Sequence, residues 1–164
     1  MIHGYDDQGS RFGATGNFEV WWTPKDAEGF AERTKKLVEQ FSAFQAFAGE
    51  GGMVNGNLTL GENIADLGGL AVAYDAMKAA TAGSPDPMID GKTRDQRFFL
   101  GWASVWRRKF TADELKVRVA TDAHAPASFR AIGAPSNLPA FQTAFQCTDA
   151  QPMVRAGERR IVIW

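Results

Sequence analysis

The sequence predicts a mainly α-helical fold with minor β structure, in which all 164 residues form one domain. Three observations lead to this prediction. Apolar residues recur at helical spacing over residues 27–47, a second helical stretch covers residues 59–81, and strand-like patterns are confined to residues 53–59 and 159–164. A length of 164 residues is sufficient for one hydrophobic core and is typical of a single domain.

The first 47 residues predict a loop followed by a helix. Residues 9–22 are rich in glycine and polar side chains, which is typical of a loop. Thr23 and Pro24 form a helix start, with proline in the first turn, and helical periodicity continues to Phe47. We expect the loop to position four aromatic side chains for burial: Phe12, Phe18, Trp21 and Trp22.

The remaining elements follow from their start and stop signals. The second helix begins near Thr59 and ends before the loop "AGSPDPMIDGK", whose glycine and proline residues interrupt helices and strands. A third helix follows over residues 93–110, and a fourth starts at Thr111 with the capping-box pattern Thr111-x-x-Glu114. The composition of residues 122–139 predicts a structured loop. A last short helix opens at residues 137–139 and runs through residues 140–145.

Composition excludes several classes of function. Eighteen basic and nineteen acidic side chains give a net charge of −1, so the chain lacks the positive field that nucleic-acid binding requires. The cluster Arg107, Arg108 and Lys109 is interpreted as a solvated helix face. No span approaches the roughly 20 apolar residues of a membrane helix. Cys147 is the single cysteine, so we expect neither an internal disulfide nor a zinc or redox motif built on two thiols.

Two groups of carboxylates are candidates for chemistry. Glu62 and Asp66 are four residues apart on a predicted helix, so both side chains point to one face, where a cation or hydrogen-bond donor must compensate their repulsion. His3, one of only two histidines, is followed by Asp6 and Asp7. Taken alone, the helical pair is more simply interpreted as two solvated acids.

Together, "HGYDDQGSRFGATGN" and "GENIADLGG" resemble the neprilysin family of zinc metallopeptidases, in which an H-E-x-x-H helix is followed by G-[FY]-D-D-x-G and, about sixty residues later, by G-E-N-x-A-D. Glu62 lies 59 residues after His3. The resemblance continues through "RFFLGWASVW", "DAHAPASFRAIGAPSN" and "FQTAFQC", and so covers essentially the whole chain.

The resemblance implies a thermolysin-like (gluzincin) C-terminal catalytic subdomain and one zinc ion as cofactor. His3 would be the second histidine of H-E-x-x-H and Glu62 a further zinc ligand. A catalytic zinc takes three protein ligands and activates a water molecule in the fourth position. By resemblance, Asp66 would accept the N–H of one zinc-bound imidazole, and Asp6 is placed to orient the other.

The resemblance also assigns residues that act on a peptide substrate. His124 would stabilise the oxyanion that forms on the attacked carbonyl, and Asp122 would orient its ring and raise its proton affinity. Arg130 would hydrogen-bond the backbone of the bound peptide. Val105 and Trp106 would line the pocket for the side chain after the scissile bond, although their spacing from other aromatic residues also fits simple core packing.

The resemblance further implies a chain cut within the zinc motif, so that the first histidine, the catalytic glutamate and an N-terminal partner domain are absent. We therefore expect weak zinc binding, no peptidase activity of this chain alone, and self-association through exposed apolar surface. A bacterial-type, extracytoplasmic enzyme is favoured by analogy. The alternatives are a non-catalytic peptide-binding or structural module, and an unrelated helical domain with chance matches. The natural substrate stays open.

Overall fold

A computed structural model describes residues 2–164 and confirms the mainly helical fold. Met1, which the resemblance places inside the zinc motif, lies outside the described residues. The elements are the α-helices α1 (Pro24–Ser42), α2 (Leu60–Ala80), α3 (Arg94–Val105), α4 (Ala112–Thr121), α5 (Ala127–Gly133) and α6 (Pro139–Ala144), and the 3-10 helices η1 (Ile2–Tyr5), η2 (Gly9–Arg11), η3 (Pro135–Asn137) and η4 (Gly157–Arg159).

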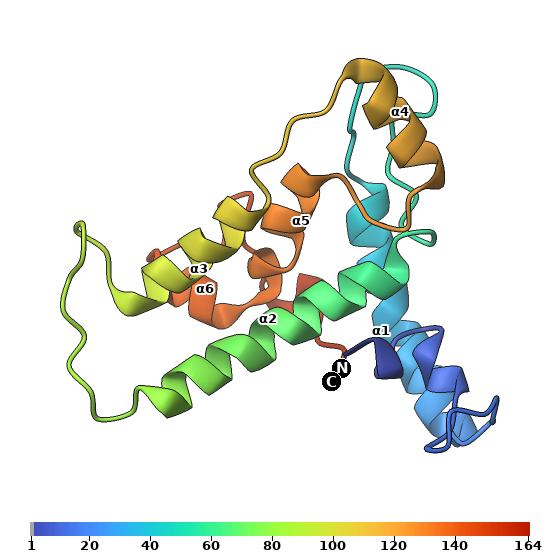
Figure 1. Ribbon diagram of the computed structural model, residues 1–164, viewed down its shortest axis with the longest axis horizontal. Helices are drawn as coiled ribbons and strands as arrows, with labels where there is room; N and C mark the ends of the chain where they lie inside the picture. The colour runs from blue at the N-terminus through green and yellow to red at the C-terminus, as the bar shows by residue number, and fades with distance from the viewer. Residues whose placement is uncertain (1) are drawn as a thin grey trace.

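Helix α2 is the central element of the fold. It runs along the lower part of Figure 1, with α1 crossing one end and with α3, α5 and α6 gathered on one side. The ends of the chain lie close together, and the rings of Tyr5 and Trp164 are 6.1 Å apart. Helices α1 and α5 come close at Gly133, where a Cβ would overlap the ring of Phe41. The buried core comprises Leu37, Phe41, Val54, Ile64, Leu67, Leu70, Phe99, Ala125, Ala134, Ile161 and Ile163.

Helix α1 begins at the predicted residue because Thr23 and Asp26 form a capping box. The Thr23 hydroxyl accepts from the backbone N–H of Asp26, and the Asp26 carboxylate accepts from the backbone N–H of Thr23. These reciprocal bonds satisfy two N–H groups that a helix start otherwise leaves unpaired. Hydrogen bonds from Thr23 lower the pKa of Asp26 below its usual value.

Replacing Thr23 by alanine is expected to lower the free energy of unfolding by about 1 kcal/mol at pH 7, the usual loss for a capping residue. A carboxyl group with a lowered folded-state pKa contributes stability above its unfolded-state pKa of 3.8, and this contribution is lost as the pH falls through the folded-state value. The difference between wild type and Thr23→Ala should therefore shrink in acid. Urea unfolding at pH 7 and near pH 3 measures it; an unchanged difference would contradict the capping box.

Two predicted helices end earlier than expected. Helix α1 ends at Ser42, because Phe44 turns back to contact Phe41 and stacks on Phe129 with ring centroids 4.6 Å apart. Helix α3 ends at Val105, where the Trp106 ring packs under the guanidinium of Arg130 at 4.2 Å. The basic cluster at residues 107–109 therefore follows the helix, and its interpretation as a helix face is wrong.

The segment 122–139 is more regular than its composition predicts. It contains α5 and η3, because Pro126 and Pro135 are tolerated at the starts of helical turns, where the missing N–H has no partner to lose. The predicted short helix α6 follows at Pro139. What looks like a loop by composition is thus mostly helical.

The strand-like patterns do not form strands within residues 2–164, where pairing is limited to three isolated bridges. Met53 makes one such bridge to Gln45. At the end of the chain Ile161 and Ile163 are buried while Val162 is exposed. An extended segment that packs one face on a helical core produces the same alternation as a strand.

The loop over residues 9–22 does not bury its aromatic side chains as predicted. Phe12, Phe18 and Trp21 are all exposed, and Trp22 is half-buried. The loop turns back on itself through the bridge between Phe12 and Phe18, so their rings contact each other at 6.0 Å instead of the core. Among residues 2–164, no helix is both long and apolar enough to cross a membrane.

Candidate functional site

The start of the chain holds His3 in a fixed orientation. Asp6 accepts hydrogen bonds from the backbone N–H groups of Gln8 (2.9 Å) and Gly9 (2.7 Å), a local pattern that favours a tight turn. Its other oxygen accepts from Nδ1 of His3 at 2.7 Å. Burial of the Asp6 carboxylate acts to raise its pKa, but these hydrogen bonds outweigh that effect and lower the pKa of Asp6. Because an ionised carboxylate can only accept, Nδ1 of His3 carries a hydrogen, and Nε2 is the ring nitrogen left to face other groups.

Glu62 lies in the first turn of α2 and faces this imidazole. Its Oε1 is 3.3 Å from Nε2 of His3, and its side chain is only 20% exposed. An unprotonated Nε2 and a carboxylate oxygen are both acceptors, so they come this close only around a shared cation or proton. Residues 59 positions apart in sequence are thus brought into contact.

His124 meets the same carboxylate from the loop between α4 and α5. Its Nε2 lies 3.2 Å from Oε2 of Glu62. Asp122 accepts from both the backbone N–H (2.9 Å) and Nδ1 (2.8 Å) of His124. Burial of Asp122 opposes ionisation, but these bonds and the charges of His124 and Arg118 lower its pKa. Both nitrogens of the His124 ring are therefore directed at carboxylates.

Arg130, on α5, closes the other side of the site. Its Nε and Nη2 donate to the two oxygens of Asp66, each at 2.7 Å, and Nη2 also donates to Oε2 of Glu62 at 3.2 Å. This fork explains how Glu62 and Asp66 lie one turn apart without a net repulsion. Burial nevertheless raises the pKa of Asp66. Within residues 2–164 Asp66 pairs with a guanidinium and contacts no imidazole, and the peptide-binding role of Arg130 stays a prediction.

The two predicted pocket residues have different environments. Trp106 lines a pocket of about 530 Å³ together with His124 and Arg130. Val105 is 61% exposed and does not line this pocket, so simple core packing is wrong for Val105. The remaining lining residues are Arg108, Phe110, Arg118, Asp122, Ala125, Pro126 and Ala127.

The geometry of His3 and Glu62 can be tested against a zinc ion. Zinc–nitrogen and zinc–oxygen bonds of about 2.1 Å at a tetrahedral angle place two ligand atoms about 3.3–3.4 Å apart. The separation of His3 Nε2 and Glu62 Oε1, 3.3 Å, agrees with this value. Residues 2–164 contain no group of three or more metal-ligating side chains. The pair therefore fits two positions of a zinc site and does not complete one.

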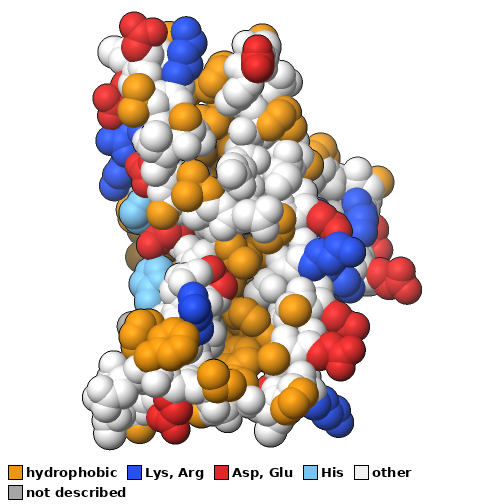
Figure 2. All heavy atoms as spheres, turned by 90° about the vertical axis from the view of Figure 1, so that its right-hand side faces the viewer, with side chains coloured by type: hydrophobic (Ala, Val, Ile, Leu, Met, Phe, Trp, Pro, Cys, Tyr) orange, Lys and Arg blue, Asp and Glu red, His pale blue; other side chains and the backbone are white. Residues whose placement is uncertain are grey.

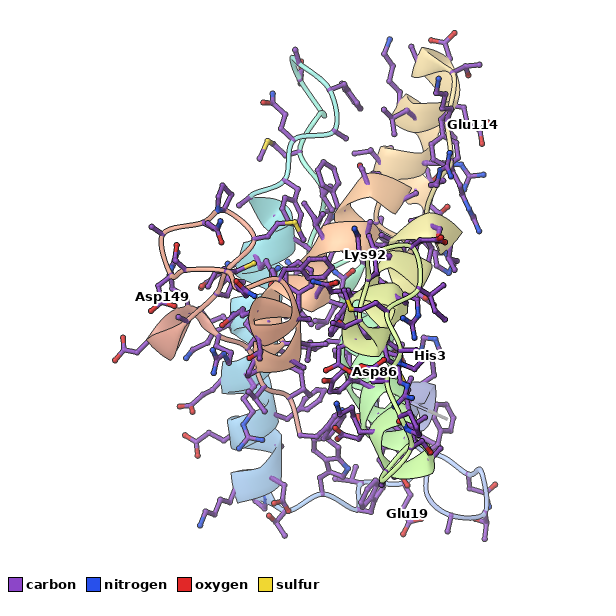
Figure 3. The ribbon with its side chains drawn as sticks, turned by 90° about the vertical axis from the view of Figure 1, so that its left-hand side faces the viewer. His3, Glu19, Asp86, Lys92, Glu114 and Asp149 are labelled. Atoms are coloured by element: carbon purple, nitrogen blue, oxygen red, sulfur yellow. The ribbon has the colours of Figure 1, made fainter. Side chains whose placement is uncertain are left out.

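Figures 2 and 3 show the site from opposite sides. In Figure 2 two histidine side chains lie at one edge of the molecule with acidic groups between them, beside a column of apolar side chains. In Figure 3 His3 projects beside α2.

One further residue of the cluster is Arg118, which binds Asp122 at 2.8 Å and which the sequence interpretation missed. The spacing of four residues on a helix between Arg118 and Asp122 was the available signal.

Comparison with known proteins gives consistent matches over the chain. The sequence profile of peptidase family M13 matches residues 1–161. Endothelin-converting enzyme 1 of Cavia porcellus is 41% identical over 157 residues, which are 93% of this chain and 20% of that enzyme. Neutral endopeptidase of Lactococcus lactis subsp. lactis is 35% identical over 164 residues, which are 100% of this chain and 24% of that protein.

A solved structure matches equally well. The crystal structure of the zinc metalloprotease Zmp1 of Mycobacterium tuberculosis in complex with an inhibitor superimposes with a TM-score of 0.94 at 43% identity. The match covers 99% of this chain and 25% of that chain. The present chain thus spans about a fifth to a quarter of the length of the relatives that it matches.

Proposed function

Because this chain belongs to peptidase family M13, the neprilysin family, we propose that it forms part of a zinc endopeptidase site that hydrolyses bonds in short peptides. The observation that carries the proposal is the contact of one carboxylate with two imidazoles. Glu62 lies 3.3 Å from Nε2 of His3 through one oxygen and 3.2 Å from Nε2 of His124 through the other. A solvated acid on an exposed helix has no reason to be placed in this way.

Each side chain of the cluster has a defined task in this proposal. His3 and Glu62 would hold zinc, which supplies Lewis-acid activation of water and of the peptide carbonyl. Asp6 orients His3 through Nδ1, so that Nε2 would be free to bind the ion. Asp66 fixes Arg130, and because a carboxylate has about four lone-pair positions, Asp66 can also accept from an imidazole.

The substrate side of the site follows from the pocket beside it. With a hydrogen on each ring nitrogen, His124 would donate from Nε2 to the carbonyl oxygen as negative charge develops on it. Asp122 holds the opposite side of that ring. Within residues 2–164 no hydrogen bond is formed by Nη1 of Arg130, which is therefore available for a peptide carbonyl. Trp106 supplies an apolar wall for a bulky side chain, whereas Val105 is exposed outside this pocket.

Two protein ligands rarely hold zinc at a working affinity, and the chain contains only two histidines and no H-E-x-x-H motif. We therefore expect the 164-residue chain by itself to bind zinc weakly and to leave peptides uncut. Location outside the cytoplasm and self-association stay predictions. Light scattering against protein concentration measures the second of these.

The experiment that tests the proposal compares the chain alone with a chimera. In the chimera, these residues replace the matching quarter of the Mycobacterium tuberculosis protein, which is 43% identical over this segment. The chimera should hold about one zinc ion per chain after dialysis and hydrolyse a fluorogenic peptide, whereas the chain alone should do neither. A well-folded chimera without zinc would overturn the proposal. Stoichiometric zinc with turnover in the chain alone would overturn the part concerning its inactivity.

A second candidate is a non-catalytic peptide-binding or structural module. It is favoured by one observation, that residues 2–164 contain no group of three metal-ligating side chains. It predicts that Glu62→Ala and His124→Ala leave zinc content, turnover and peptide affinity of the chimera unchanged. Loss of any of these would exclude it.

Replacing Asp6 by asparagine tests the orientation of His3. The amide oxygen can keep the hydrogen bonds from Gln8 and Gly9, but the amide nitrogen then faces Nδ1 of His3 as a donor. The imidazole must move its hydrogen to Nε2, where it blocks the metal. We expect zinc affinity of the chimera to fall about 10–100-fold, as for other residues that orient a ligand. Asp7→Asn is the neighbouring control; equal losses in both variants would contradict the role of Asp6.

A further inference from the structure

Arg118, on α4, forms ion pairs with two carboxylates, and one of them, Asp122, belongs to the candidate site. Its Nε donates to Glu114 at 2.7 Å, and its Nη1 donates to Oδ2 of Asp122 at 2.8 Å. Its guanidinium also lies over the ring of Phe110, 4.8 Å from the centroid. The side chain is thus held on three sides, and one of its contacts is the residue that orients His124.

The Asp122 carboxylate divides its two oxygens between different partners. Oδ1 accepts from the backbone and ring nitrogens of His124, and Oδ2 accepts from Arg118. The terminal torsion of an aspartate is broad, so a carboxylate held through one oxygen can rotate. Bonds to both oxygens restrict this rotation and fix the direction from which Nδ1 of His124 is bound.

The orientation of His124 depends on few contacts. Its side chain is 51% exposed, and its ring is held by Asp122 on one side and Glu62 on the other. The supporting helix α4 lies apart from the helices that surround α2, with Glu114 at its outer end (Figures 1 and 3). Val119 is the buried residue of that helix. Apolar packing of α4 itself therefore contributes little to the orientation of this ring.

We propose that Arg118 is a positioning residue, which fixes the Asp122 carboxylate and through it the ring of His124. The expected effect of Arg118 on kcat rests on the proposed function, in which His124 donates to the developing oxyanion. The claim that Arg118 fixes Asp122 and His124 in place does not depend on that function. Because Arg118 is 41% exposed, its ion pairs contribute little to folding stability. Its effect should appear in the imidazole and not in the melting temperature.

Nuclear magnetic resonance of the 164-residue chain tests this claim directly, because the chain has only two histidines. Near pH 8, where an ordinary imidazole is neutral, the Nδ1 proton of His124 should be protected by Asp122. In Arg118→Ala its exchange rate should rise about two- to threefold, the change expected when an exposed ion pair is removed. The Nδ1 signal of His3 serves as the internal reference.

The matched control is Glu114→Gln, which removes the other ion pair of Arg118 and leaves the bond to Asp122 intact. Unchanged His124 signals in Arg118→Ala, or equal changes in both variants, would overturn the proposal, because Arg118 would then act only by stabilising α4. If Arg118→Ala does not fold, Arg118→Gln retains part of the side-chain packing on Phe110 and is measured in its place by the same criteria.

Hydrolysis by the chimera separates this claim from the proposed function. Arg118→Ala should lower kcat about two- to threefold with KM unchanged, and Arg118→Lys should restore part of it. An unchanged kcat in a variant with altered His124 signals would overturn the catalytic consequence alone. If the wild-type chimera does not hydrolyse peptides, the proposed function fails, and the resonance experiment still decides the role of Arg118.

Discussion

Replacing Glu62 by glutamine is expected to remove zinc from the chimera. The substitution keeps the shape of the side chain but eliminates the negative charge that faces Nε2 of His3 at 3.3 Å. Residues that merely orient a ligand account for 10–100-fold in zinc affinity, so loss of a ligand should cost about 100-fold or more. Zinc content after dialysis and competition with a chromogenic chelator measure this loss, and turnover should fall with it.

The control for this variant is Glu32→Gln, an exposed glutamate on α1. It removes the same charge at a distance from the cluster and should leave both zinc content and turnover unchanged. Circular dichroism shows whether each variant is folded. A folded Glu62→Gln chimera that retains stoichiometric zinc would exclude Glu62 as a ligand and would favour the non-catalytic alternative.

Replacing Gly9 by alanine is expected to disrupt the site through the backbone. A Cβ on Gly9 would overlap the carbonyl oxygen of His3 and lie 2.8 Å from Cα of Gly4. Because these are backbone atoms, His3 itself must move. Displacing a catalytic group by about 1 Å costs roughly 100-fold in rate, and overpacking costs about 1–3 kcal/mol of stability. Zinc titration, turnover and urea unfolding of the chimera measure these losses.

Gly4→Ala is the matched control, because Gly4 follows His3 directly in η1 and a Cβ there has no neighbour within 4 Å. It should reduce neither zinc affinity nor turnover. Equal losses in the two variants would show that the segment needs glycine for flexibility, and would contradict the requirement for close approach at Gly9.

The sequence predicts the order of the helices because their start signals are local. Thr23, Thr93 and Thr111 each accept a hydrogen bond from the third helical residue, as the sequence indicates. Helix ends are predicted less well. Helices α1 and α3 end where Phe44 and Trp106 contact residues on α5, and such contacts depend on how distant segments pack.

The burial of the aromatic residues in the first loop also depends on tertiary packing that the sequence pattern does not predict. Hydrophobicity alone predicts burial of Phe12, Phe18 and Trp21, yet all three are exposed, because the rings of Phe12 and Phe18 pack against each other and not on the core. The alternation at residues 159–164 was equally ambiguous, since an extended chain alternates its side chains whether it pairs with a strand or packs on helices.

The contacts of the candidate site likewise fall into two groups, those that are local in the sequence and those that depend on tertiary packing. The sequence by itself determined the family, the pairing of His3 with Asp6 and of Asp122 with His124, and the shared face of Glu62 and Asp66, because these contacts lie within one helical turn or one tight turn. Only the tertiary structure decided that both imidazoles meet one carboxylate and that Arg130 neutralises Asp66 across 64 positions. Hydrogen-bond geometry within a turn is set by local backbone angles, whereas contacts between α2, α5 and the chain start depend on the packing of the whole core.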